Sequence, residues 1–238
     1  IQHKSIFDPY SVGDFEHDVI TLLEKLFQQH DIVVMVGGSG LYINAVVYGL
    51  DDFPKVSSEI RNELSGYYET QGIAYLQKKL KELDPIQYSQ MDIQNPQRMI
   101  RALEVCIASG RPYSSFLNKK ETLRDFKNII IGLTAEREVV YNRINDRVEL
   151  MLENGLLIEA QTLFPHKKLN ALQTVGYREL FDFFEGKISL DFAIEEIKKN
   201  TRRFAKRQYT WFHKNKDIHW LEISQLDNLS ISQLLDIQ

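Results

Sequence analysis

With 238 residues, 43% of them hydrophobic and 26% charged, the chain can bury a core without a disulfide or a metal ion, which excludes a mainly disordered protein. The 29 basic and 33 acidic residues give a net charge of -4, which excludes a protein that coats nucleic acid with its whole surface but allows a local basic site. One cysteine, Cys106, and no apolar run near the ~20 residues of a membrane span predict a cytoplasmic protein that does not contact membranes.

The first pattern along the chain is helix, strand, glycine turn and helix. Apolar residues recur at helical spacing from Asp14 to about Asp31, and residues 32–36 are all apolar and mostly β-branched. Such a run predicts a strand that is buried on both faces of a parallel sheet. The glycine turn 37–40 then leads into an apolar helix over 41–48. Open α/β sheets bind ligands at the carboxyl ends of their strands, so this turn is a candidate site, although it also fits a purely structural tight turn.

A second region, residues 54–121, predicts a helical insertion, because polar helical patterns alternate there with glycines and prolines and no strand pattern occurs. Its clearest helix covers 96–108, with an apolar stripe of Ile100, Leu103 and Ile107. The sequence therefore predicts an α/β core formed by residues 1–53 and 122–238 around this insertion.

The strand pattern returns at residues 128–133, and a helix over 135–154 follows, with Gly155 just past its end. One face of that helix is apolar and carries Tyr141, Ile144, Val148 and Met151. A short helix over 156–164 comes next, and a last strand is predicted at 218–223.

The segment 197–216 contains eight basic residues and no acidic one, so it carries +8 against -12 for the rest of the chain. A surface with eight uncompensated cations is typical of proteins that bind a polyanion, and a solvated surface is the alternative. Helical spacing places five residues on one face of this segment, namely Ile197, Thr201, Phe204, Gln208 and Trp211. The pattern predicts that the two aromatic residues of this face, Phe204 and Trp211, lie in the core.

Two pairs of arginines are candidates for binding phosphate. Arg98 and Arg101 lie three positions apart and Arg143 and Arg147 four positions apart, so each pair shares one helix face. Guanidinium groups with this spacing can bind phosphate oxygens bidentately, whereas a solvated helix flank is the commoner role of such a pair. The chain has no G-x-x-x-x-G-K-[ST] loop, and no histidine pairs with a cysteine at zinc-binding spacing.

Five motifs in order resemble those of the tRNA dimethylallyltransferase family, namely residues 36–42, 98–105, 143–151, 175–180 and 201–211. The resemblance implies a P-loop NTPase-like α/β core whose helical insertion binds the anticodon stem of tRNA. It implies transfer of a dimethylallyl group from dimethylallyl diphosphate to N6 of adenosine 37, with Mg²⁺ as cofactor. The sequence lacks the Cys2His2 finger of eukaryotic relatives and in this respect resembles the bacterial form of the family. For that form we expect a cytoplasmic monomer.

The same resemblance implies roles for individual residues. Ser39 and Arg147 would be catalytic, and the diphosphate would be bound by Arg101, Arg143 and Arg147. No residue of the chain is implied as a metal ligand. Ser39 stands where the family usually has threonine, so the hydroxyl is kept. The residues implied in tRNA binding are Ser39, Arg61, Gln97, Arg98, Arg101, Gly176, Tyr177, Arg178, Lys206, Arg207, Gln208, Trp211 and Phe212.

Two family features are not found in this sequence, namely the diphosphate-binding G-P-T-x-x-G-K-[ST] loop and the Asp-Ser segment that supplies the general base. In the family both precede the segment that Ile1 begins here, so we expect the chain as given to be N-terminally incomplete and inactive. Two other functions stay open. One is an adenylate isopentenyltransferase that acts on a free nucleotide, and the other is a non-catalytic RNA-binding module. The basic segment and the insertion favour tRNA, because a free nucleotide needs neither.

Overall fold

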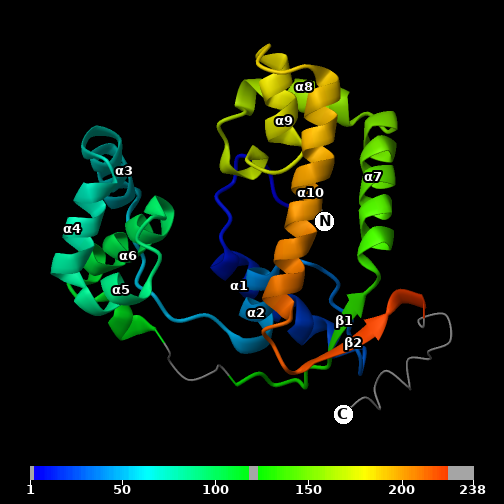
Figure 1. Ribbon diagram of the computed structural model, residues 1–238. Coiled ribbons are helices and arrows are strands. Elements are labelled where there is room, and N and C mark those ends of the chain that lie inside the picture. Colours follow the sequence, from blue (N-terminus) through cyan, green and yellow to red (C-terminus); the bar gives the residue numbers. More distant parts are fainter. Residues whose placement is uncertain (1–2, 118–122, 225–238) are drawn as a thin grey trace. The chain divides into compact units, whose positions relative to one another are not determined.

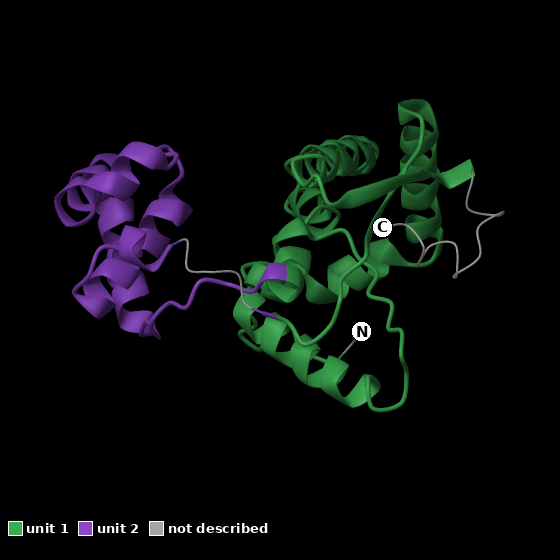
Figure 2. Ribbon diagram, turned by 90° about the horizontal axis from the view of Figure 1, so that it is seen from below, with its two compact units in different colours: residues 1–47, 124–238 green, residues 48–123 purple. Residues whose placement is uncertain are grey.

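The computed structural model describes residues 3–117 and 123–224 (Figure 1). The chain forms two compact units (Figure 2). Unit 1 combines residues Ile1–Val47 and Arg124–Gln238, and unit 2 is the continuous segment Tyr48–Leu123. The insertion boundary predicted at residues 121–122 falls outside the described residues.

Unit 1 is mainly helical and contains one small sheet. Its helices are α1 (Val12–Leu26), α2 (Gly40–Tyr48), α7 (Arg137–Glu153), α8 (Leu156–Leu163), α9 (Tyr177–Phe184) and α10 (Leu190–Phe212), and the short 3₁₀ helices are η2 (Phe164–His166) and η3 (Asn170–Leu172). Strands β1 (Ile130–Thr134) and β2 (Ile218–Glu222) pair in parallel, with Gly132 opposite Trp220.

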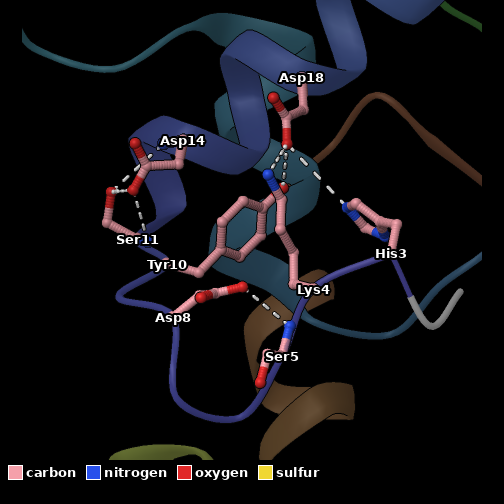
Figure 3. A network of polar contacts seen from close by, with 8 residues as sticks. All are labelled: His3, Lys4, Ser5, Asp8, Tyr10, Ser11, Asp14 and Asp18. Carbon is pink, nitrogen blue, oxygen red and sulfur yellow. Dashed lines mark hydrogen bonds and ion pairs between the residues drawn. The ribbon is translucent and has the colours of Figure 1, made fainter.

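The first helix begins at a capping box (Figure 3). The Asp14 backbone N–H donates to the Ser11 hydroxyl at 3.2 Å, and the Ser11 backbone N–H donates to the Asp14 carboxylate at 2.8 Å. Next to this cap, Asp18 accepts a hydrogen bond from the Tyr10 hydroxyl and pairs with Lys4. Burial and the nearby Asp18 carboxylate raise the pKa of Tyr10 to about 12. These contacts tie the segment before α1 to the helix.

The core of unit 1 is formed where α7, α8, α9 and α10 meet. Its buried side chains come from these four helices and from η3: Val148, Leu156, Ala160, Leu172, Leu180, Phe181, Ala193 and Ile197. Gly155 adopts a φ of +96° between α7 and α8, a conformation that L side chains rarely adopt. Figure 1 shows α7 and α9 beside the first half of α10, so the second half of that helix extends beyond the core.

The strand predicted at residues 32–36 is wrong, because this segment forms no strand and its side chains are not buried. Val34 and Val36 are 77% and 90% exposed. A β-strand needs a neighbouring strand to satisfy its backbone, and the sheet of the described residues consists of β1 and β2 alone. An apolar run thus indicates strand propensity but not the partner that a strand requires.

Unit 2 is a helical unit with its own core. Its elements are α3 (Ser58–Gln71), α4 (Ile73–Leu83), α5 (Pro85–Gln90), α6 (Pro96–Ser109) and the 3₁₀ helix η1 (Tyr113–Phe116). The buried side chains come from α3, α4 and α6: Leu64, Leu76, Leu80, Met99, Ile100, Ala102 and Leu103. Helix α6 starts at its cap Asn95 and ends at Gly110, whose φ of +67° terminates the helix.

Some predicted core positions are exposed. Ile107 of α6 is 43% exposed, although Ile100 and Leu103 of the same predicted stripe are buried, since Ile107 lies in the last turn of the helix. Met151 of α7 is 37% exposed. Phe204 and Trp211 are 43% and 42% exposed, since they lie on the half of α10 that extends beyond the core.

Arg124 is the first residue of unit 1 after unit 2, and it joins the two parts of unit 1. Its guanidinium donates to the backbone oxygens of Ala45 and Val46 at 2.7 and 2.9 Å and pairs with Glu16 of α1. The two oxygens belong to the last turn of α2, where backbone acceptors lack helical partners. Arg124 therefore connects α1 to the end of α2 at the point where the chain leaves and re-enters unit 1.

Within the described ranges, no helix is both long and apolar enough to cross a membrane.

Candidate functional site

In unit 1 the glycine turn lies against the second half of α10. The Gln208 side-chain amide donates to the Gly38 carbonyl oxygen at 2.8 Å. A Cβ atom on Gly38 would overlap the Gln208 side chain, and one on Gly40 would overlap the Trp211 indole. Nothing lies within 4 Å of a Cβ placed on Gly37. Gly40 is thus required by the close approach of the Trp211 ring, whereas at Gly38 the contact is with the end of a flexible side chain that can move aside.

Ser39 stands at the start of α2. Its backbone oxygen accepts from the Ile43 N–H at 3.0 Å, so it begins the helical hydrogen bonding. Its side chain is exposed, and no group among the described residues hydrogen-bonds the hydroxyl. The free N–H groups at a helix N-terminus carry a partial positive charge, which favours an anionic or electron-rich ligand there.

The basic residues of α10 fall into two groups. Lys198 pairs with Glu149 and Glu195 at 2.6 and 2.9 Å, and Lys199 pairs with Glu196 at 2.7 Å. Arg202 donates to Asn145 at 2.7 Å and lies over the Tyr141 ring. The first basic residues of the segment therefore already have partners on α7 or α10.

Further along α10, the cations have no carboxylate partner among the described residues. Lys206 and Arg207 are exposed, and the described residues offer neither of them an ion pair. Arg207 lies over the Phe204 ring at 5.5 Å, and Phe212 is half-buried. Lys206 and Arg207 thus bring part of the unneutralised charge of the segment to the same turns of α10 that contact the glycine turn.

The two arginines of α7 point away from α10. Asn145 and Glu149 face α10 through their contacts with Arg202 and Lys198. At ~100° per residue, Arg143 and Arg147 lie on the opposite side of the helix, close to each other. Both are exposed, and the described residues provide no ion pair for either. They form a pair of free guanidinium groups.

Residues Gly176–Arg178 lie elsewhere in unit 1. Gly176 has a φ of +104°, and its N–H donates to Glu179 at 2.9 Å, which in turn accepts from Asn200 of α10 at 2.8 Å. Tyr177 packs on the core, and its hydroxyl hydrogen-bonds Glu159; burial and this carboxylate raise its pKa to about 12. Asn200 and Gln208 are ~12 Å apart along α10, so this group is not brought to the glycine turn.

Unit 2 contains a different cationic site, which we call the Glu104 clamp and which consists of Arg61, Arg101 and Glu104. Arg61 binds the Glu104 carboxylate bidentately at 2.7 and 2.6 Å, and Arg101 donates to it at 2.6 Å. The Glu104 side chain is 0% exposed, whereas those of Arg61 and Arg101 are 59% and 41% exposed. Each guanidinium is thus fixed by the buried carboxylate of Glu104, while the arginine side chain stays partly exposed to solvent.

The surroundings of the clamp add aromatic surface. Arg101 lies 5.2 Å from the centre of the Phe53 ring, which stacks on Tyr113. Burial by itself would raise the pKa of Glu104, but hydrogen bonds from Arg61 and Arg101 outweigh it and hold the pKa below its usual value. The Glu104 carboxylate therefore stays ionised and keeps both guanidinium groups in place. Gln97 and Arg98 are exposed in the first turn of the same helix, α6.

Glu104 is the residue of this site that the sequence analysis does not single out. It interrupts a run of buried residues in α6 and follows Arg101 by three positions. A charged residue inside an apolar helix face normally has a partner, so this interruption was the available signal.

A magnesium site is not evident in the part of the chain that the structure describes. Residues 3–117 and 123–224 contain no group of three or more His, Cys, Asp or Glu side chains placed to hold a metal ion. These residues alone do not fit the expected Mg²⁺.

A helix N-terminus open to solvent, together with unpaired cations on a neighbouring helix, is characteristic of α/β proteins that bind anionic groups. The family model for IPP transferase matches residues 1–215, and the chain belongs to this family. It is 61% identical to the tRNA dimethylallyltransferase of Christiangramia forsetii, over 94% of this chain and 74% of the relative. It is 52% identical to that of Flavobacterium johnsoniae, over 99% and 78%.

Solved structures agree. The tRNA isopentenylpyrophosphate transferase of Bacillus halodurans matches 99% of this chain and 77% of its own, with 33% identity and a TM-score of 0.62. A eukaryotic dimethylallyltransferase acting on tRNA matches 100% of this chain and 63% of its own, with 22% identity and a TM-score of 0.76, a likeness of fold. The predicted fold class, a P-loop NTPase-like α/β core with a helical insertion, is confirmed.

Proposed function

We propose that the full-length gene product transfers a dimethylallyl group from dimethylallyl diphosphate to N6 of adenosine 37 in tRNA. The observation that carries this proposal is the identity of 61% with a tRNA dimethylallyltransferase over nearly the whole chain. The unpaired cations of α10, the glycine turn and the Glu104 clamp support it, because each offers positive charge to a polyanion.

The acceptor chemistry suits the position of Ser39. Adenine N6 is a weak nucleophile because its lone pair is delocalised into the ring, so an acceptor must take up its proton as the new C–N bond forms. The exposed hydroxyl of Ser39 can accept a hydrogen bond from the N6 amine and orient it at the start of α2, while the proton passes to the aspartate of the Asp-Ser segment that the family resemblance implies as general base. The base must leave the stacked loop to reach this position.

The leaving group needs positive charge. As the C–O bond of dimethylallyl diphosphate breaks, charge accumulates on the departing diphosphate, and fixed cations stabilise it more in the transition state than in the substrate. We assign this role to Arg147, helped by Arg143, because both guanidinium groups are exposed and free of carboxylates among the described residues. Mg²⁺ belongs to the same proposal as a cofactor of the diphosphate, with no ligand assigned.

The RNA would be bound by both units. In unit 2 we assign Arg61, Gln97, Arg98 and Arg101 to the anticodon stem. In unit 1 we assign the segment 206–212 of α10, which carries Lys206, Arg207, Gln208, Trp211 and Phe212. Gly176, Tyr177 and Arg178 are proposed as further tRNA contacts, of which the exposed Arg178 is the most accessible. All these groups lie on one chain, so a monomer suffices, and we expect an enzyme with tRNA as its substrate to work in the cytoplasm.

Transfer of radiolabelled dimethylallyl diphosphate distinguishes this function from its alternatives. The full-length gene product is incubated with an anticodon stem-loop that contains adenosine 37, with the same stem-loop carrying guanosine there, and with AMP. We expect label in the first RNA only. Label in AMP alone would indicate an adenylate isopentenyltransferase, and RNA binding without any label would indicate a non-catalytic module.

A further inference from the structure

Three aromatic rings form a column at the end of α10. The Tyr209 ring stacks on His213 with centroids 3.6 Å apart, and His213 stacks on Trp220 of β2 at 4.0 Å. The His213 Nδ1 lies 3.0 Å from the Tyr209 carbonyl oxygen, which holds the imidazole between the other two rings. The column therefore joins the last turn of α10 to the sheet.

The lower end of the column is closed by β1. A Cβ atom on Gly132 would lie 2.7 and 2.8 Å from two atoms of the Trp220 ring, so this ring rests directly on the strand backbone. Gly132 and Trp220 are opposite each other in the parallel pair. The absence of a side chain at Gly132 thus gives the column a rigid base.

The Tyr209 end of the column is exposed to solvent. Tyr209 is 55% exposed, and among the described residues His213 and Trp220 are the only aromatic or cationic groups that pack with its ring. An aromatic ring held from one side and open on the other can continue its stack with one more planar ring.

The charge around Tyr209 identifies the kind of ring. Lys206 lies one turn before Tyr209 on the same helix side, and Lys214 and Lys216 follow the end of α10. All three lysines are exposed and have no carboxylate partner among the described residues. Aromatic platforms beside unpaired cations are the arrangement that single-stranded nucleic acids use, with bases on the rings and phosphates on the cations.

We propose that Tyr209, at the open end of the Tyr209–His213–Trp220 column, is a stacking platform for an unpaired base of the RNA substrate. The cations around it contact the phosphates that flank this base. The inference rests on the proposed function and adds a binding residue to it. The base is distinct from the reacting adenosine, which we place at Ser39.

The test uses anticodon stem-loops in which 2-aminopurine replaces one unpaired base at a time. Stacking quenches the fluorescence of this base, so we expect quenching at one position other than 37 on binding to the wild-type protein. Tyr209→Ala should abolish that quenching and weaken RNA binding about 5- to 150-fold, the range for losing one stacked base. Tyr209→Phe keeps the ring and should restore both signals.

Phe192→Ala is the matched control, because Phe192 is an aromatic residue of α10 with a similar exposure of 54% and lies outside the basic segment. It should leave quenching and affinity unchanged. Equal quenching and affinity in Tyr209→Ala and wild type would overturn the platform while the transfer reaction stands. Loss of affinity in Phe192→Ala as large as in Tyr209→Ala would overturn it too. Wild-type protein that transfers no label and binds no RNA would instead contradict the proposed function.

Discussion

Two cationic regions of this molecule are built in different ways. In unit 2, Arg61 and Arg101 share the buried carboxylate of Glu104, which fixes their geometry and cancels one of their two charges. In unit 1, Lys206 and Arg207 keep their whole charge because the described residues give them no ion pair. A fixed guanidinium favours geometric selectivity, whereas free cations favour attraction that depends on salt. The difference predicts that substitutions in the Glu104 clamp alter the geometry of binding, whereas substitutions of Lys206 and Arg207 alter only the electrostatic attraction.

The largest effect should come from the guanidinium to which we assign stabilisation of the leaving diphosphate. In the full-length gene product, Arg147→Ala should reduce kcat/KM for dimethylallyl diphosphate. The reduction should correspond to about 2–4 kcal/mol of lost transition-state stabilisation, as expected for losing one preorganised group that stabilises the charge on the leaving diphosphate. Affinity for tRNA should change little. Arg137→Ala, which removes another exposed arginine of α7, is the control for steady-state kinetics. Weakened tRNA binding with unchanged turnover would refute the leaving-group role.

The glycine turn should show a smaller effect that depends on position. Gly40→Ala would drive a Cβ into the Trp211 ring, and an overpacked contact of this kind costs about 1–3 kcal/mol. Gly37→Ala meets nothing within 4 Å and serves as the control. Denaturant unfolding measures both, and activity should fall with stability only for Gly40→Ala. Equal losses in both variants would mean that backbone conformation, and not α10, requires the glycines.

The Glu104 clamp should contribute stability that depends on pH. The pKa of Glu104 is lowered in the folded state. The stabilising contribution is therefore present above the pKa of the unfolded state, ~4.3, and is lost as the pH falls through the pKa of the folded state. Glu104→Gln should cost about 1–2 kcal/mol of unfolding free energy at pH 7, since the two guanidiniums are partly solvated. The difference from wild type should shrink in acid.

Glu82→Gln is the control for the clamp, because Glu82 makes an exposed pair with Lys79 at 3.9 Å. Its effect should stay below about 0.5 kcal/mol at every pH. A difference between Glu104→Gln and wild type that is constant from neutral to acid pH would show that packing, and not charge, makes Glu104 stabilising.

The smallest effect is a change in salt dependence along α10. Replacing Lys206 and Arg207 by glutamine should lower the slope of log K against log salt by about 0.7–0.9 for each phosphate that the variant no longer neutralises. The same replacement of Lys198 and Lys199 removes equal charge from residues that already pair with carboxylates, and it should leave the slope nearly unchanged. A titration of stem-loop binding across salt concentrations compares the two. Equal slopes would assign all four residues to solvated surface.

Much of the architecture followed from local patterns. The apolar stripe of α6, the glycine after α7 and the charge of α10 all mark elements that the structure contains. The failures have a common cause, which is that periodicity reports a face but not what covers it. Residues 32–36 lack a strand partner in the described chain, and Phe204 and Trp211 lie beyond the helices that cover the rest of α10.

The candidate site was less predictable. Sequence motifs indicated Ser39, Gln208 and Trp211 separately, but the contact between the glycine turn and α10 links residues 170 positions apart, and no local pattern encodes such a distance. Glu104 was missed because a single acid in an apolar helix gives no hint of its second partner, Arg61, which lies 43 positions away.

The position of Arg124 has a consequence for how the helical unit could have been acquired. This residue binds the last turn of α2 through the backbone oxygens of Ala45 and Val46, so the two ends of an insertion of more than 70 residues meet at a closed junction. For an insertion whose ends are already held together, doubling its length adds only about 0.6 kcal/mol of closure entropy. Such a junction tolerates grafting, so evolution can exchange or enlarge the module between residues 48 and 123 while the host fold stays intact.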